Sequence, residues 1–197
     1  MRIGAVVLGL VAAMTAPAAA QWNIGFEIRT THYRGSSRDT TNSGGPETFR
    51  PANATTFGVQ VDRGFGRTRL GLQLAIANVG LTAAGPGLIL TDNSTGELLE
   101  GRLLGSFQVV GIGSSGAVRL ELGPSLHLWT SGDQTRSRLG ATLATAYEWP
   151  IARRFSGAIR LETMFSKSWF DAGDVPPEYE RRVTWRYGVG LGLRYRL

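Results

Sequence analysis

The chain has 197 residues, with 21 Lys and Arg, 15 Asp and Glu, no cysteine and a formal charge of +6. Without cysteine it forms no disulfide, thiolate metal site, iron–sulfur site or lipid-modified cysteine. Apolar residues make up 42% and charged residues 18%, which excludes a polar disordered chain, and the 27 glycines lack the triplet period of collagen.

The first twenty residues are typical of a secretory signal peptide. Arg2 supplies a positive start, Ile3 to Ala13 form an apolar run, and Ala18 to Ala20 offer a cleavage site of small residues. The run is shorter than the roughly 20 residues that a membrane-spanning helix needs. We therefore predict a cleaved signal peptide, residues 1–20, and one exported domain, residues 21–197, from which only the charge of Arg2 has been removed.

From residue 22 onward, apolar side chains recur at every second position, which is the period of a β-strand. Eight segments with this pattern follow one another along the chain. They cover residues 22–29, 57–62, 70–77, 98–110, 118–129, 139–148, 159–166 and 183–197. The fourth is the weakest because Leu104 breaks its alternation, and the last is the clearest because every odd position is apolar or aromatic.

The connections between these segments alternate in length. Short turns are predicted at Arg63–Gly66, Gly113–Gly116 and Pro150–Arg154, and longer connections at 34–52, 79–97, Ser131–Arg136 and 170–181. Within 79–97, Leu88–Leu90 and Glu97–Leu99 flank Asp92–Gly96, which predicts a hairpin extension. Gly111–Gly116 fits G-x-G-x-x-G, but a strand follows it and not a helix, so we interpret it as a turn.

The composition of the two faces favours a membrane barrel over a soluble one. The non-apolar face is rich in Gly, Ala, Ser and Gln, which suits a narrow packed interior, whereas a solvated surface would carry Lys, Glu and Thr. Aromatic residues near the strand ends predict two interfacial belts. One belt contains Trp22, Tyr147, Trp149 and Tyr195, and the other contains Phe57, Trp169, Trp185 and Tyr187.

The predicted fold is therefore all-β, a closed eight-stranded antiparallel up-and-down transmembrane β-barrel. Closure is expected because unpaired strand edges in lipid cost several kcal/mol per polar group, so the last strand must pair with the first. The even strand number places both ends of the domain on the side of the short turns.

The signal peptide, the eight alternating strands, the long and short connections and the aromatic last strand together resemble the small OmpA/OmpX-type outer-membrane β-barrels. The resemblance implies an outer-membrane location and assembly by periplasmic chaperones and the barrel-assembly machinery. Members of that group usually end in Phe or Trp. This chain has Tyr195 two places before its end and departs from the pattern with Leu197.

Charged residues on the inward face predict a packed polar lumen and not a wide pore. Buried charges must be paired, and an eight-stranded barrel is only wide enough for its own side chains to fill it. The inward set is Glu27, Arg29, Asp62, Arg102, Arg119, Glu121, Glu148, Arg160, Glu162, Arg186 and Arg194.

Ser125 and His127 share the inward face, with Glu121 and Glu148 as candidate acidic neighbours, and such a set is the basis of an ester-hydrolase alternative. The resemblance to barrel enzymes that deacylate lipid A fails, because those carry His-x-Ser and this chain carries Ser-x-His. His32 has no second ligand at a metal-binding spacing. We therefore expect no enzyme activity, no catalytic residue, no cofactor and no metal.

Arginines in or beside the long connections predict contact with lipopolysaccharide, because guanidinium groups bind phosphates bidentately. These candidates are Arg34, Arg38, Arg50, Arg136, Arg138, Arg181 and Arg182. The last long connection is acidic, and we interpret it as a solvated loop.

The sequence thus predicts an outer-membrane barrel with a structural or surface-interaction role, monomeric, in contact with membrane lipid and lipopolysaccharide and not with nucleic acid. Two alternatives stay open at this point. One is an enzyme that modifies outer-membrane lipid, similar to a lipid A deacylase, and the other is a narrow barrel for solute transport.

Overall fold

The computed structural model describes residues 21–41, 47–92, 96–113, 116–171, 173–174 and 176–197, and only the backbone of Leu88. The predicted signal peptide, residues 1–20, lies outside the described residues. The described part of the chain is all-β. It contains no helix that is long and apolar enough to cross a membrane.

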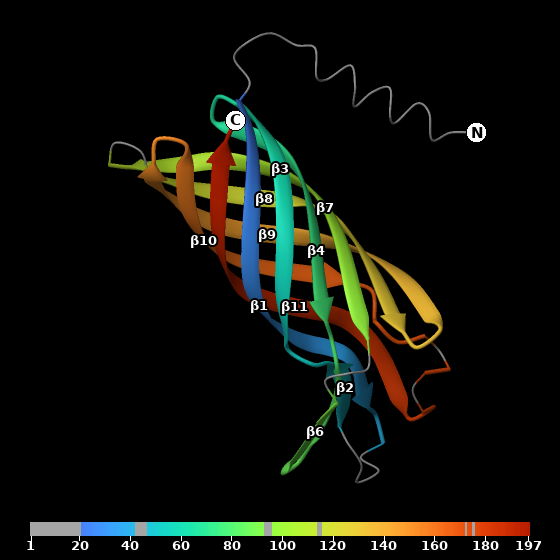
Figure 1. The fold of residues 1–197 in the computed structure, drawn as a ribbon. Helices are drawn as coiled ribbons and strands as arrows, with labels where there is room; N and C mark the ends of the chain where they lie inside the picture. Colours follow the sequence, from blue (N-terminus) through green and yellow to red (C-terminus); the bar gives the residue numbers. More distant parts are fainter. Residues whose placement is uncertain (1–20, 42–46, 93–95, 114–115, 172, 175) are drawn as a thin grey trace, which may run out of the picture.

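Eight antiparallel strands of the described residues form a closed ring of hydrogen bonds, drawn in Figure 1 as an elongated barrel. Neighbours in the ring are neighbours along the chain, and β1 closes the ring by pairing with both β3 and β11. The predicted pairing of last and first strands is therefore confirmed. The strands are β1 (Gln21–Asp39), β3 (Ala54–Phe65), β4 (Thr68–Asn78), β7 (Glu97–Ile112), β8 (Gly116–Ser131), β9 (Gln134–Ala152), β10 (Phe155–Ser166) and β11 (Tyr179–Arg196).

Several strands are much longer than their apolar alternation predicts. Both β1 and β9 have 19 residues. At about 3.3 Å per residue each is roughly 60 Å long, whereas about 9–11 tilted residues are enough to cross a bilayer. In β1 the alternation marks only the first part of the strand, because beyond Ile28 the outward positions become polar while the backbone pairing with β11 continues to Asp39.

The end of the barrel opposite the termini carries a second, three-stranded sheet, with β2 (Thr48–Pro51), β5 (Leu81–Gly85) and β6 (Leu88–Asp92) in the order β2-β5-β6. A hairpin extension is therefore present, but its two strands are β5 and β6 and not the predicted segments Leu88–Leu90 and Glu97–Leu99. Its turn is at Pro86 and Gly87, where Gly87 has a φ of 73°, and Glu97–Leu99 belong to the barrel strand β7. The turn follows the glycine because positive φ carries no steric penalty there.

The connection predicted at Ser131–Arg136 is a two-residue turn, since β8 ends at Ser131 and β9 begins at Gln134. Gly132 has a φ of 56°, which permits this tight reversal. Of the three predicted short turns, those around Gly66 and Arg154 join β3 to β4 and β9 to β10. The central residues of the third, 114 and 115, lie outside the described residues.

The two faces of the wall are placed as predicted. On β11, Leu191 is 57% exposed on the outside, whereas Arg186 is 2% exposed on the inside. The same division holds around most of the ring, where most large apolar side chains of β3, β4, β7 and β10 are exposed and the arginines and glutamates of the lumen are buried; Leu98, Leu104 and Met164 are apolar side chains that point inward. The interior of this barrel is therefore ionic and its outer wall is apolar.

Candidate functional site: the lumen and its two ends

The middle of the lumen is filled by a layer of four arginines and four glutamates, which we call the ion-pair layer. Its members are Arg29, Arg102, Arg160, Arg186, Glu27, Glu100, Glu121 and Glu162. They come from β1, β7, β8, β10 and β11, so the pairs connect strands that are far apart in the ring. The layer carries no net charge, which satisfies the requirement that buried charges be paired.

Glu162 and Glu100 lie at the centre of this layer. Glu162 accepts bonds of 2.6 and 3.0 Å from Arg102 and of 2.9 Å from Arg29. Glu100 accepts bonds from Arg102 and Arg186. A third group is formed by Arg160, which lies 2.6 Å from Glu121 and 3.1 Å from Glu27.

Glycines of β11 make room for these side chains. A Cβ atom at Gly188 would lie 3.1 Å from Cδ of Arg29, and one at Gly190 would lie 3.3 Å from the carboxyl of Glu27. The glycines that alternate with apolar residues in the last strand therefore have a packing role, because they leave the lumen to the longer side chains of β1. Between the ion-pair layer and the short turns, Arg160, Glu121 and Glu148 line a space of about 30 Å³.

The sequence pattern did not reveal two members of the lumen network, Glu100 and Arg69. Glu100 shares the inward parity of Arg102, but the inward Leu98 and Leu104 mask the alternation of β7. Arg69 lies one residue before the predicted strand and bonds Glu148 at 2.7 and 2.9 Å. The eleven charged residues predicted to point inward are all buried or half-buried.

Ser125 and His127 are in contact, since His127 Nε2 lies 2.9 Å from Ser125 Oγ. The acid beside them is neither Glu121 nor Glu148. It is Glu100, whose Oε2 lies 3.9 Å from His127 Nδ1, because the register pairs Glu100 with His127 across β7 and β8. All three side chains are buried, and a Cβ at Gly140 would lie 2.9 Å from Ser125 Oγ. The group is thus packed tightly inside the wall.

An apolar cap closes the lumen at the end of the long loops. It consists of Tyr33, Ala54, Ala77, Val79, Leu98, Trp129, Trp169 and Phe170. The rings of Trp129 and Trp169 lie 4.9 Å apart, and Arg186 of the ion-pair layer reaches up to the Tyr33 hydroxyl at 3.4 Å. The cap therefore rests directly on the ion-pair layer.

The predicted place of Trp169 in an outward aromatic belt is wrong. Trp169 follows the end of β10 at Ser166, so the period of two no longer determines its side, and it is buried in the cap. Other predicted belt residues do lie on the outer wall. Trp185 stacks on Phe165 with 5.7 Å between the rings, and Tyr147 stacks on Trp149 at 5.8 Å.

Four of the seven arginines predicted to contact lipopolysaccharide bind other parts of the chain. Arg136 bonds Asp174 at 2.8 Å, and Arg138 bonds Asp171 at 2.8 Å and the Ser168 carbonyl at 2.6 Å. Arg182 bonds Glu180, and Arg50 bonds the Tyr33 carbonyl. The acidic loop predicted to be merely solvated thus holds its neighbouring arginines.

The other three candidates are exposed on the paired strands β1 and β11. Arg34 lies 5.6 Å from the ring of Tyr187, which also stacks on His32 at 5.3 Å. Arg38 pairs in register with Glu180, and Arg181 with Ser37. Within the described residues, no group of three or more His, Cys, Asp or Glu is placed to hold a metal ion.

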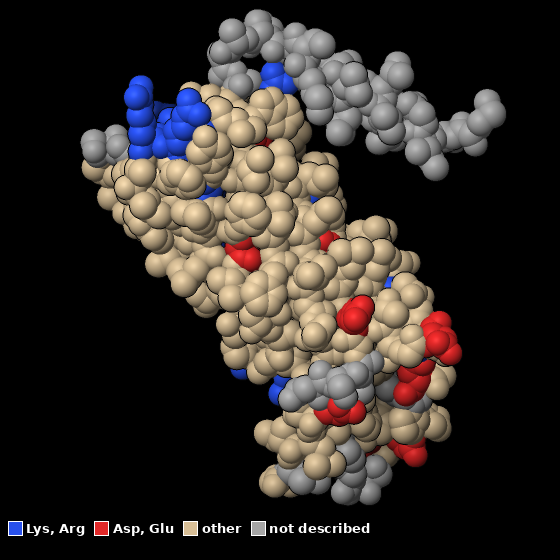
Figure 2. All heavy atoms as spheres, viewed as in Figure 1, with Lys and Arg blue, Asp and Glu red and all other residues tan. Residues whose placement is uncertain are grey.

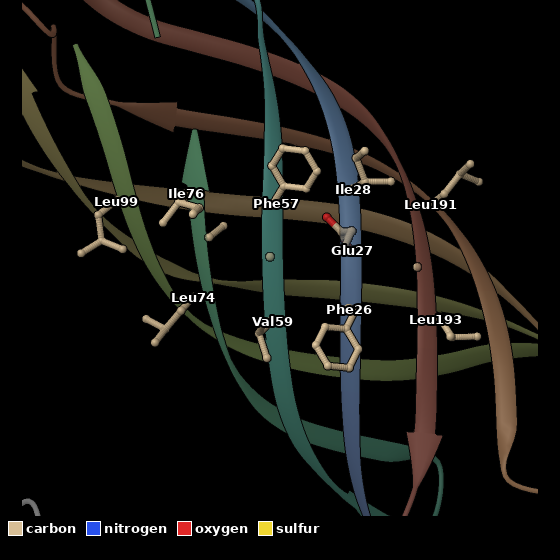
Figure 3. A pocket seen from close by; sticks show the side chains of 13 residues that line it. Phe26, Glu27, Ile28, Phe57, Val59, Leu74, Ile76, Leu99, Leu191 and Leu193 are labelled. Carbon is tan, nitrogen blue, oxygen red and sulfur yellow. The ribbon is translucent and has the colours of Figure 1, made fainter. Parts of the chain in front are cut away.

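The outer wall has an apolar hollow of about 780 Å³ over β1, β3, β4, β7 and β11. Figure 3 shows Phe26 and Ile28 on β1, with Phe57 and Val59 on β3 beside them. Glu27 lies between Phe26 and Ile28 and is flanked in register by Gly58 and Gly192, which carry no side chain. The hollow is therefore a thin place in the wall, lined with hydrocarbon.

No protein-family model matches the chain, and no curated protein matches it. Among solved structures, the chain is similar to Neisserial surface protein A, with a TM-score of 0.59 at 10% identity, over 91% of this chain and all of that one. It is also matched to the N-terminal β-barrel domain of Pseudomonas aeruginosa OprF at TM-score 0.45 and 11% identity, over 89% of this chain and 99% of that one. Ail of Yersinia pestis is matched at a TM-score of 0.39 and 13% identity, over 89% of this chain and 97% of that one.

The likeness to Neisserial surface protein A shows that the chain has the fold of the small eight-stranded outer-membrane β-barrels, which confirms the predicted resemblance. This fold and the apolar outer wall together agree with the predicted outer-membrane location.

Proposed function

We propose that this protein is an outer-membrane β-barrel that spans the bilayer as a monomer, keeps a packed and non-conducting lumen, and acts through its structure and its surface loops. The observation that carries the proposal is the inversion of its two faces. Leucine, valine and phenylalanine side chains cover the outside of the ring, and arginine–glutamate pairs fill the inside.

The apolar wall supports a lipid environment. A monomeric soluble protein rarely exposes a contiguous apolar patch larger than a few hundred Å². Here such side chains cover all the strands of the ring, including Leu72 on β4, Leu122 on β8 and Leu161 on β10, each more than half exposed. Lipid chains would remove this surface from water, and the closed hydrogen-bond ring leaves no strand edge unpaired in hydrocarbon.

The test of this part uses the folded protein in phospholipid vesicles. We expect unboiled protein to migrate differently from boiled protein on a detergent gel, and the vesicle-embedded strands to resist protease. Equal mobility before and after boiling, together with complete digestion in vesicles, would refute a membrane-embedded barrel.

A packed lumen supports a role other than transport. Within the described residues, the ion-pair layer occupies the middle of the lumen and the apolar cap covers it at the end of the long loops. We expect wild-type protein in a planar bilayer to show no steady discrete openings. Reproducible single-channel steps at neutral pH would favour the narrow transport barrel instead.

The buried setting of Ser125, His127 and Glu100 supports a role other than catalysis. Nucleophilic catalysis needs space for a substrate carbonyl beside the serine oxygen. Here that oxygen is against Gly140 and the whole group is inside the wall. Purified protein incubated with lipid A should release no acyl chain, and release that disappears in Ser125→Ala would restore the enzyme alternative.

Three of the seven candidate arginines remain in the proposed contact with lipopolysaccharide, because they are exposed on β1 and β11. They are Arg34, Arg38 and Arg181. They lie at the end of the long loops, where Arg34 is next to the outward Tyr187 and Trp185. Because guanidinium pairs well with phosphate, the triple change to Gln should slow refolding in the presence of lipopolysaccharide. The same triple variant should refold like wild type in phosphatidylcholine alone, and equal rates in both lipids would remove these residues from the proposal.

A further inference from the structure

The end of the barrel that carries the short turns holds a basic cavity of about 760 Å³. Six arginines line it, together with one carboxylate, that of Glu148. The arginines are Arg69, Arg119, Arg153, Arg154, Arg194 and Arg196. Figure 2 shows blue side chains gathered at this end of the barrel and red ones at the end of the long loops.

The carboxylates near the cavity are already used. Glu148 accepts two bonds from Arg69 and one from Arg194. Asp62 lies 3.2 Å from Arg194 and also accepts a bond of 2.8 Å from Asn23. These two acids therefore balance Arg69 and Arg194, and among the described residues no carboxylate forms an ion pair with the other four arginines of the lining.

Arg119 is the most informative of the four. It is 2% exposed, and its guanidinium bonds the Ser106 hydroxyl at 2.8 Å, the Ser106 carbonyl at 3.3 Å and the Arg67 carbonyl at 3.0 Å. All three partners are neutral, and no carboxylate of the described residues lies within 4.0 Å of it. A buried cation without a counter-charge is costly. An anion in the cavity would supply the missing charge.

We propose that this cavity binds a phosphate-bearing anion through Arg119 at its base and Arg153, Arg154 and Arg196 at its rim. Arginine binds phosphate oxygens bidentately, and the volume is within the range of roughly 300–1,000 Å³ of small-ligand sites. The opposite end is closed by the apolar cap and the ion-pair layer, so the ligand enters from the side of the short turns. The assignment of this side to the periplasm rests on the proposed function. The chemistry of the site is independent of that function.

The phosphate has two possible sources, a soluble phosphate anion or the headgroup of an anionic phospholipid. The soluble source is tested by calorimetric titration of inorganic pyrophosphate into folded protein in zwitterionic micelles. The lipid source is tested in nanodiscs of phosphatidylcholine with phosphatidylglycerol, by counting the phosphatidylglycerol retained in native mass spectrometry. Gel mobility verifies folding before either measurement, so a failure of binding is separate from a failure of the barrel assignment.

The variants are Arg119→Gln and the rim pair Arg153→Gln with Arg154→Gln. The charge-matched control is Lys167→Gln with Arg182→Gln, two exposed residues at the opposite end of the barrel. We expect each cavity variant to weaken pyrophosphate binding by about tenfold or more, or to lose the retained phosphatidylglycerol, and the control to behave like wild type. Because the rim pair is exposed, it tests the site even where Arg119→Gln does not fold.

Loss of pyrophosphate binding in the cavity variants identifies a soluble phosphate anion as the ligand. Loss of the retained phosphatidylglycerol alone identifies a lipid headgroup as the ligand. The proposal is overturned if folded wild type binds neither probe. It is also overturned if the control loses as much binding as the cavity variants, because the effect then comes from net charge and not from this cavity.

Discussion

Removing one charge from the ion-pair layer should destabilise the barrel more than removing a charge from its surface. Glu162→Gln keeps the size of the side chain and one carbonyl acceptor but deletes the negative charge that faces Arg102 at 2.6 and 3.0 Å and Arg29 at 2.9 Å. The layer would then hold four arginines against three glutamates, with the excess charge buried.

The magnitude follows from the burial of the partners. Breaking a buried ion pair from one side typically costs about 3–5 kcal/mol, because the remaining charge is left without compensation. The folded-to-unfolded ratio should therefore fall by a factor of about 100 to several thousand. A second change, Arg102→Gln, restores the charge balance, so the double variant should lose less than the sum of the two single variants.

The assay is guanidinium unfolding in phospholipid vesicles, followed by the fluorescence of the five tryptophans and by gel mobility. The control is Glu180→Gln, whose partner Arg182 lies 3.0 Å away with side chains 58% and 49% exposed. An exposed pair contributes about 0–1 kcal/mol. If Glu162→Gln costs no more than Glu180→Gln, the interpretation of the lumen as a dry, ion-paired interior is refuted.

Other substitutions test the wall, the cap and the Ser–His group. Leu191→Arg places a charge on the lipid-facing side of β11 and should lower the free energy of unfolding in vesicles by about 2–4 kcal/mol. The control Leu90→Arg, on β6 of the three-stranded sheet, should have little effect. Equal unfolding midpoints of the two variants would contradict a lipid-facing wall. Trp129→Ala removes the centre of the apolar cap and should cost about 3–5 kcal/mol, seen as earlier unfolding at the loop end in hydrogen exchange. Gly140→Ala places a Cβ 2.5 Å from the Phe165 carbonyl oxygen and 2.9 Å from Ser125 Oγ and should lower the thermal midpoint. An unchanged midpoint would contradict the tight packing of the Ser–His group against β9 and β10.

The side on which each strand residue lies was predictable because β-strands alternate strictly, and a residue's parity fixes its face once one neighbour is placed. This rule placed Arg186 inside and Leu191 outside from the last strand alone. It fails where both parities are apolar, as at Leu104 in β7, and where the strand has ended, as at Trp169. In those places packing with distant residues decides the side.

The partners of the candidate site residues were less predictable, because they depend on register and on loop paths. The acid beside His127 is Glu100 only because β7 and β8 pair in one particular register. Likewise, Arg136 and Arg138 lie in β9, and the loop after β10 returns to place Asp174 and Asp171 on them. A two-residue change in register would change every such pair and still leave each side chain on the same face, so the alternation pattern does not determine the register.

The two ends of the barrel differ in their net charge. The ion-pair layer is neutral, and at the loop end Asp171, Asp174 and Glu180 offset their neighbouring arginines. Among the described residues, the arginines that line the cavity therefore give the end of the short turns a surplus of positive charge. Most of them, such as Arg153 and Arg154, lie on an exposed rim, where water and salt screen them. Arg119 is the exception because it is buried at the base of the cavity, and a position so unfavourable for an unpaired cation is explained if an anion occupies the cavity in the cell.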